Sequence, residues 1–161
     1  LIAVALAMLK LLRQACRPHD AVLGIVEGTN DRYTARVEDG GKLISGLIIF
    51  RFEASLVFFN ADHFTERVHA VISSADTKPR TFLFDAESVP LLDVSGAYAL
   101  DALRAELADR GIVLGIARAR GLFRMMLERA GIAEKIGNQN LFHTVHAGAV
   151  AFQLAERNGK A

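Results

Sequence analysis

Short β-like runs alternate with helix-like segments from residue 43 onward, and this alternation constrains the fold more than any other feature of the sequence. Three runs are rich in aliphatic and aromatic residues: Leu47–Phe52, Thr81–Ala86 and Ile112–Ala117. The segments between them carry apolar residues three or four positions apart, which is the period of a helix with one buried face. Such an alternation is typical of a mostly parallel sheet joined by right-handed crossovers. The sequence therefore predicts an α/β domain in which helices flank the sheet.

Capping and stop residues place four helices in this domain. The first is expected directly after Asn60, and the second after Asp93 with Gly111 as its stop. The third covers "RGLFRMMLERAG" and ends at Gly131, and the last begins after Thr144. Each has an apolar stripe that can face the sheet.

The first two strands are expected to form a hairpin or a bent pair. Only Glu53 and Ala54 separate Leu47–Phe52 from a second β-rich run, Ser55–Phe59. The sheet is then mixed, although mostly parallel. A further short strand is expected at Ala21–Val26. We divide this part of the chain into a linker, one domain and a C-terminal tail, at residues 18–41, 42–157 and 158–161.

Residues 1–17 form an apolar run followed by basic residues. "LIAVALAMLKLLRQACR" carries its charges only at Lys10, Arg13 and Arg17, and Pro18 ends the helix. The run is shorter than the ~20 residues that cross a bilayer. Apolar residues followed by lysine and arginine match the cytoplasmic end of a transmembrane helix. The alternative is a juxtamembrane or amphipathic helix that docks on the domain or frays.

The overall charge argues against one class of partner. The chain has 161 residues, with 19 lysines and arginines against 18 aspartates and glutamates, and no basic stripe with interleaved aromatic residues. We therefore expect no nucleic-acid partner. Cys16 is the single cysteine, which excludes a disulfide within the chain and favours a reducing compartment.

The loop "LLDVSGAYAL" delivers Asp93-Val94-Ser95-Gly96 onto the start of a helix. If the strands are parallel neighbours, this loop shares one edge of the sheet with Asn60 and with Arg118 and Arg120. Outward-facing amides at Ser95, Gly96 and Ala97 would suit an anion, and Gly96 would let it approach closely. The residues alone favour the simpler interpretation, in which Asp93 only caps the helix and its carboxylate repels an incoming anion.

Other chemistry has little support in the sequence. The chain lacks both usual glycine-rich phosphate motifs and the G-x-S-x-G motif. His143 and His146 have no cysteine or third histidine beside them, so we expect no metal site. A phosphate-handling hydrolase using Asp85 or Asp93 is the enzymatic alternative, but we expect no enzyme.

The motif "LLDVSGAYAL", preceded by "TFLFDAESV" and followed by "RGIVLGIARARGLFRMMLERAGI", resembles a STAS domain. This fold is shared by anti-sigma-factor antagonists and by the cytoplasmic domains of SulP-type sulfate and anion permeases. The upstream stretches "VLGIVEGTNDRY" and "SGLIIFRFEASLVFFNADHFTERV" are similar to the permease branch, and "LIAVALAMLKLL" then fits the end of the last membrane helix. The resemblance extends over nearly the whole chain.

The resemblance implies a cytoplasm-facing regulatory domain of a permease in the cell membrane. Its partners would be the transmembrane domain of the same protein, a second copy in a homodimer and, with no required cofactor, a weakly bound nucleotide such as GTP, GDP or ATP. The antagonist branch carries its phosphorylated serine where this chain has Val94, so a free-standing regulator without that serine is the alternative. The family's binding region matches eight positions here: Phe59, Asn60, Ala61, Leu92, Asp93, Val94, Ser95 and Gly96.

Overall fold

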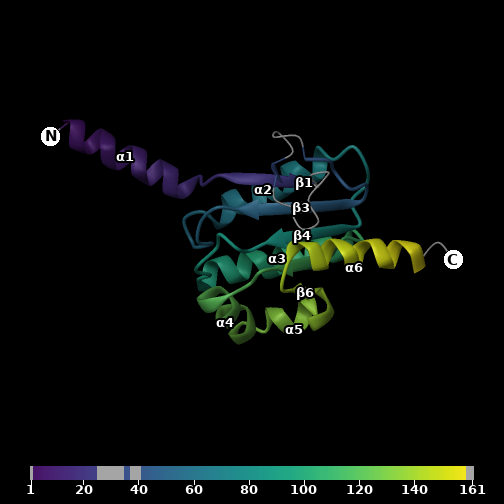
Figure 1. Ribbon diagram of the computed structural model, residues 1–161. Helices are drawn as coiled ribbons and strands as arrows, with labels where there is room; N and C mark the ends of the chain where they lie inside the picture. The colour runs from purple at the N-terminus through teal and green to yellow at the C-terminus, as the bar shows by residue number, and fades with distance from the viewer. Residues whose placement is uncertain (1, 25–34, 37–40, 159–161) are drawn as a thin grey trace.

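A six-stranded mixed sheet forms the centre of the domain in the described part of the chain, which comprises residues 2–24, 35–36 and 41–158 of a computed structural model (Figure 1). Strands β3 to β6 run parallel, and β1 is antiparallel to both of its neighbours. Across the sheet the order is β2 (Ala35–Arg36), β1 (Asp20–Gly24), β3 (Leu47–Phe52), β4 (Thr81–Asp85), β5 (Val113–Ala117) and β6 (Leu141–Phe142). The predicted α/β class with a mixed, mostly parallel sheet is confirmed.

The predicted hairpin between Leu47–Phe52 and Ser55–Phe59 is wrong. Strand β3 has β1 on one side and β4 on the other, so neither of its edges is open to the second run. Leu56 makes a single bridge to Leu92, and the chain then turns into a helix. The strand expected at Ala21–Val26 starts at Asp20 and is the antiparallel partner of β3, whereas Ile25 and Val26 lie outside the described residues.

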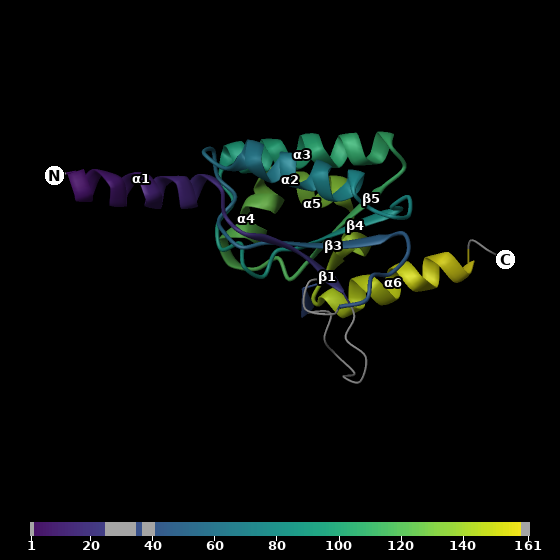
Figure 2. The same cartoon turned by 90° about the horizontal axis from the view of Figure 1, so that it is seen from above.

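Helices cover both faces of the sheet (Figure 2). One face carries α2 (Ala61–Ser73), α3 (Val94–Asp109), α4 (Gly121–Arg129) and α5 (Ile132–Ile136), and the other carries α6 (Val145–Asn158). The period of two within β3 explains this arrangement, because Ile48 and Phe50 face the first group and Leu47 and Ile49 face α6. Phe50 packs edge-on against Phe64 of α2, with ring centroids 6.1 Å apart.

Helix α6 lies close to the sheet because of a glycine. A β-carbon at Gly148 would stand 2.7 Å from the Leu83 side chain, so a larger residue would require that side chain to shift. The α6 start after Thr144 is confirmed, and the Thr144 hydroxyl accepts a hydrogen bond from the Ala147 amide. The short elements before it, α5, the 3₁₀ helix η2 (Asn138–Asn140) and β6, were not predicted.

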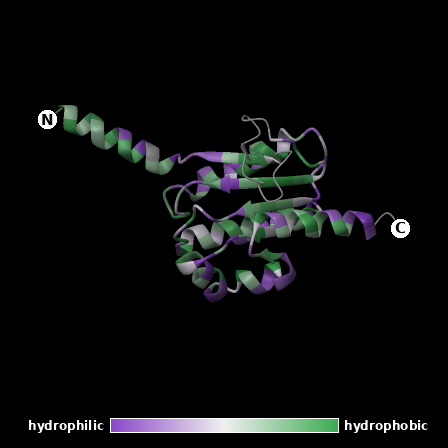
Figure 3. Cartoon of the chain, in the orientation of Figure 1, coloured by the Kyte–Doolittle hydropathy of each residue, from purple (hydrophilic) through white to green (hydrophobic). Residues whose placement is uncertain are grey.

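Helix α1 (Ile2–Cys16) extends away from the domain at the end where β3 and β4 finish (Figures 1 and 2). Its apolar side chains remain in solvent, with Val4, Leu6, Met8 and Leu11 each more than 60% exposed. In Figure 3 most residues of α1 have the colour of hydrophobic residues, and the hydrophilic ones lie towards the domain. Docking of this helix on the domain, which was one of the alternatives left open by the sequence, is therefore not observed in the described residues. No helix in the described ranges combines the length and apolar character needed to cross a membrane.

Candidate functional site at the carboxyl edge of the sheet

Asp93 holds the loop that opens α3. One carboxylate oxygen, Oδ1, accepts a hydrogen bond from the Gly96 amide at 2.7 Å, and Oδ2 accepts one from the Phe58 amide at 3.0 Å. The backbone carbonyl of Asp93 accepts from the Ala97 amide. The predicted cap at the start of α3 is confirmed. The same carboxylate also joins the start of α3 to the loop before α2.

Asn60 organises the second loop at this edge. Its side chain is buried, with the residue 1% exposed. Oδ1 accepts from the Val57 amide at 3.0 Å, while Nδ2 donates to the Ser55 carbonyl at 3.0 Å and to the Ala15 carbonyl of α1 at 3.5 Å. Asn60 stands at the N-cap position of α2 as predicted, but its side chain makes no capping bond. It ties the loop to itself and to the last turn of α1.

Gly96 serves packing within the chain. A β-carbon at this position would stand 2.2 Å from the carbonyl oxygen of Leu56, so no other residue fits without displacing that loop. The expectation that Gly96 leaves space for a ligand is therefore wrong, because Leu56 fills that space. The Gly96 and Ala97 amides, expected to point outward, already bond to Asp93.

The structure brings the eight predicted binding residues together at one edge, but only some of them reach the surface. Asn60, Ala61, Leu92 and Gly96 are buried, and Asp93 is half-buried. Phe59, Val94 and Ser95 are exposed, and the ring of Phe59 packs edge-on against that of its exposed neighbour Phe58. A molecule binding here would meet an aromatic pair beside the first turn of α3.

A buried charge cluster, which was not predicted, lies at the end of β4. Asp85, at the end of β4, is fully buried. Its carboxylate accepts from Nε of Arg51 at 2.8 Å, from Nε of Arg118 at 2.9 Å and from the Glu87 amide at 3.2 Å. Glu87 also pairs with Arg118 at 2.6 Å. The four side chains carry two positive and two negative charges, so their charges cancel.

The sequence contains a signal from which this cluster could have been predicted. Arg51 interrupts an apolar strand, Asp85 ends the next, and the two are direct partners in the β3–β4 register. Arg118 follows Ala117, which is the partner of Asp85 in β5. Charged residues at the same end of neighbouring parallel strands are expected to meet. Asp85 is fully enclosed by these partners, so it is not placed to reach a substrate. This argues against Asp85 as the catalytic residue of the hydrolase alternative.

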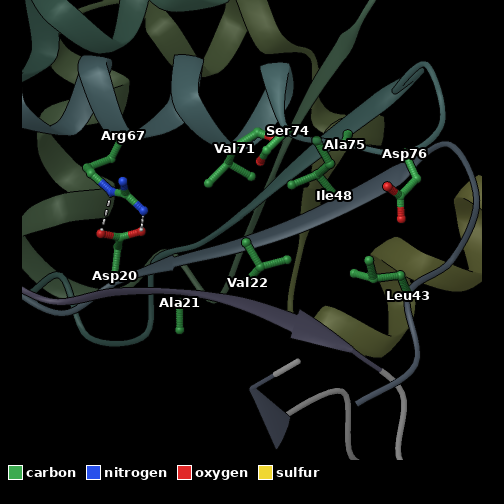
Figure 4. Close-up of a pocket in the computed structure, with 10 residues that line it drawn as sticks. All are labelled: Asp20, Ala21, Val22, Leu43, Ile48, Arg67, Val71, Ser74, Ala75 and Asp76. Carbon is green, nitrogen blue, oxygen red and sulfur yellow. Dashed lines mark hydrogen bonds and ion pairs between the residues drawn. The ribbon is translucent and has the colours of Figure 1, made fainter. Parts of the chain in front are cut away.

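A cavity of about 310 Å³ opens elsewhere, between β1 and α2 (Figure 4). Val22, Ile48 and Val71 give it an apolar wall, and Arg67 and Asp20 close one end through hydrogen bonds of 2.9 and 3.2 Å. The hydrogen bond to Asp20 raises the pKa of the Arg67 guanidinium above its ordinary value. Because these two charges neutralise each other, this end offers no net charge for recognising an ion.

Comparison with known proteins identifies relatives of the chain. Residues 42–148 match the family described as STAS domain. Over 153 residues the chain is 37% identical to a probable sulfate transporter of Mycobacterium tuberculosis, which covers 95% of this chain and 27% of the transporter. It is 30% identical to high affinity sulfate transporter 2 of Stylosanthes hamata, covering 94% and 24%. The chain thus spans about a quarter of the length of these relatives.

Solved structures share the fold. The murine Solute Carrier 26 family member A9 anion transporter aligns with a TM-score of 0.81 at 21% identity, over 95% of this chain and 25% of that one. The STAS domain of a SulP transporter from Vibrio cholerae aligns with a TM-score of 0.59 at 26% identity, over 74% and 89%. With a family match that covers residues 42–148 and a sheet that agrees with these structures, the chain belongs to the STAS domain family.

Proposed function

We propose that this chain is the cytoplasm-facing regulatory domain of a sulfate or anion permease in the cell membrane. The observation that carries the proposal is the 37% identity to a probable sulfate transporter, which extends over 95% of the chain and so includes most of α1 as well as the domain. Transport itself would belong to a membrane domain of the same protein, and this domain would regulate it. The similarity to transporters also favours a role without catalysis.

Helix α1 supports the attachment to a membrane domain. Its apolar residues are exposed to solvent and do not pack on the described part of the domain. A helix of 15 residues is about 22 Å long, against about 30 Å for a bilayer core. Lys10, Arg13 and Arg17 separate the apolar part from the domain, which is the order expected where a helix leaves the membrane on the cytoplasmic side. We infer that α1 is the cytoplasmic end of a membrane helix.

The coding sequence upstream of Leu1 tests this attachment cheaply. A permease requires several apolar helices of about 20 residues each in that region. If the reading frame instead starts close to Leu1 and encodes no such helix, the permease assignment fails. The free-standing anti-sigma-factor antagonist would then be the better account, although Val94 occupies the position of the phosphorylated serine in that branch.

We further propose that the start of α3 binds a guanine or adenine nucleotide weakly. The exposed pair Phe58 and Phe59 offers a stacking surface for a base, and the exposed Ser95 lies in the first turn, where a helix favours negative charge. The Asp93 carboxylate occupies the Gly96 amide and repels phosphates, so we expect the affinity to be low.

An added charge at Ser95 tests this site without disturbing the loop. Ser95→Asp places a carboxylate in the first turn of α3, which favours the helix but repels nucleotide phosphates. The matched control, Gln153→Glu, adds the same charge on the exposed surface of α6. In amide NMR titrations with GTP, GDP and ATP, the first variant should lose the shifts at Asn60 and Ser95–Ala97 and the control should retain them. If both variants showed the same shifts on titration, the nucleotide would not bind at the start of α3.

A further inference from the structure

A polar cavity of about 460 Å³ lies beyond the carboxyl ends of β5 and β6, and Arg118 of the Asp85 cluster is among the residues that line it. Its polar lining comes from Arg118 and Arg120 after β5, Arg124 in α4, Asn138 in η2 and His143 after β6. No carboxylate is among the described residues that line it. In open α/β sheets, the space beyond the carboxyl ends of the strands is where ligands bind.

The arginines of this cavity differ in how far their charges are already balanced. Arg118 is held by Asp85 and Glu87, and Arg124 pairs with Glu128 at 2.6 Å. Arg120 is exposed and forms no ion pair with any residue in the described ranges. The cavity therefore carries a positive charge that the protein itself does not neutralise.

The backbone at Arg118 fixes one wall of the cavity. Its φ of 59° lies in the left-handed region, which is uncommon for a residue other than glycine. The Arg118 amide donates to the Phe142 carbonyl at 2.9 Å, and its guanidinium is held on Asp85, so both ends of the residue are fixed. Uncommon backbone conformations persist where the surrounding structure enforces them, and they are concentrated at binding sites.

We propose that this cavity binds a tetrahedral oxyanion, either free sulfate or phosphate or the phosphate of an anionic lipid headgroup. The forked donors of Arg120 and Arg124 match pairs of oxygen atoms on such an ion. The Asn138 side chain and the His143 ring, which also line the cavity, add further donors. The site is separate from the proposed nucleotide position and does not depend on the permease assignment.

Arg120→Gln tests the site, because Arg120 is exposed and its replacement should leave the fold intact. Arg129→Gln is the matched control, since it removes the same charge from the exposed last residue of α4, the helix that Arg120 precedes. Amide NMR titration uses sodium sulfate, sodium phosphate and, at equal ionic strength, sodium chloride. We expect saturable shifts at residues 118–124 with sulfate and with phosphate, but not with chloride. Binding should be roughly tenfold weaker in Arg120→Gln than in the control.

A second arm separates the two sources of the anion. Sedimentation with phosphatidylglycerol vesicles measures binding to lipid, with uncharged phosphatidylcholine vesicles for comparison. Binding that depends on Arg120 supports the site in either experiment. If it occurs in the NMR titration the ligand is a soluble ion, and if it occurs with phosphatidylglycerol vesicles the ligand is a lipid headgroup. Shifts that chloride reproduces, or binding that is equal in the two variants in both arms, would overturn the proposal.

Discussion

Replacing Asp85 by asparagine removes one negative charge from the interior of the domain while the volume of the side chain hardly changes. Asp85 is fully buried, and its partners Arg51 and Arg118 are only 17% and 14% exposed. In Asp85→Asn these two guanidinium groups would share the single remaining carboxylate, that of Glu87, which is 45% exposed. The variant would therefore leave one positive charge uncompensated and mostly shielded from water.

The cost of this change follows from the burial. Removing one partner of a buried ion pair typically costs about 3–5 kcal/mol. Glu87 remains 2.6 Å from Arg118, so we expect Asp85→Asn to lower the free energy of unfolding by an amount at the lower end of this range, near 3 kcal/mol. The total free energy of unfolding of such a domain is about 5–15 kcal/mol. The variant should still fold, but with a much lower denaturation midpoint.

Urea unfolding followed by circular dichroism measures this difference, provided that the dependence on urea concentration is the same in both proteins. Glu87→Gln is the matched control, since it removes a charge of the same sign from the same cluster at an exposed position, and we expect it to cost less than about 1 kcal/mol. If the two variants lost similar stability, or if Asp85→Asn lost less than about 1 kcal/mol, burial would not be the determining factor and the reasoning would be refuted.

Three further perturbations test other parts of the structure. Gly96→Ala should lower the free energy of unfolding by about 1–3 kcal/mol or more in urea titration, because its methyl group collides with the Leu56 carbonyl; unchanged stability would show that the loop can move away. The hydrogen bond from Lys135 lowers the pKa of Asp101 below its ordinary value, so Asp101 stabilises the fold above about pH 4 and loses this contribution as the pH falls through the lowered value. The stability advantage of the unmodified protein over Asp101→Asn should therefore be present at pH 7 and shrink in acid, and an advantage independent of pH would contradict this assignment. Removing residues 1–12 should change the melting temperature by less than about 2 °C, since the side chains of residues 2–12 are exposed, and a larger fall in calorimetry would indicate that α1 packs on the domain.

Local signals made much of the fold predictable. The alternation of apolar runs and helical stripes gave the parallel strands β3, β4 and β5, and their helices, because each pattern is set by neighbours within one turn or one strand. The cap at Asp93 was predictable for the same reason, since the bond to the Gly96 amide spans three residues.

Contacts between distant segments were not predictable in the same way. The period of β3 does not reveal that its antiparallel partner is β1, on the other side of a linker, rather than the adjacent run at Ser55–Phe59. The role of Gly96 depends on the Leu56 carbonyl, forty residues earlier in the chain, and this contact exists only once the loops have packed. The Asp85 cluster likewise requires the register of three strands.

Sulfate uptake by the membrane protein that we propose contains this chain is the most direct test of its role. Uptake of radiolabelled sulfate into proteoliposomes would be compared between the intact protein and a variant that lacks residues 42–157, with the amount of inserted protein measured in each. We expect the intact protein to take up sulfate, and the shortened protein to insert but to transport at a clearly different rate. Equal uptake rates per inserted protein would contradict a regulatory role of the domain, and no sulfate uptake by the intact protein would contradict the assignment of sulfate as the transported anion.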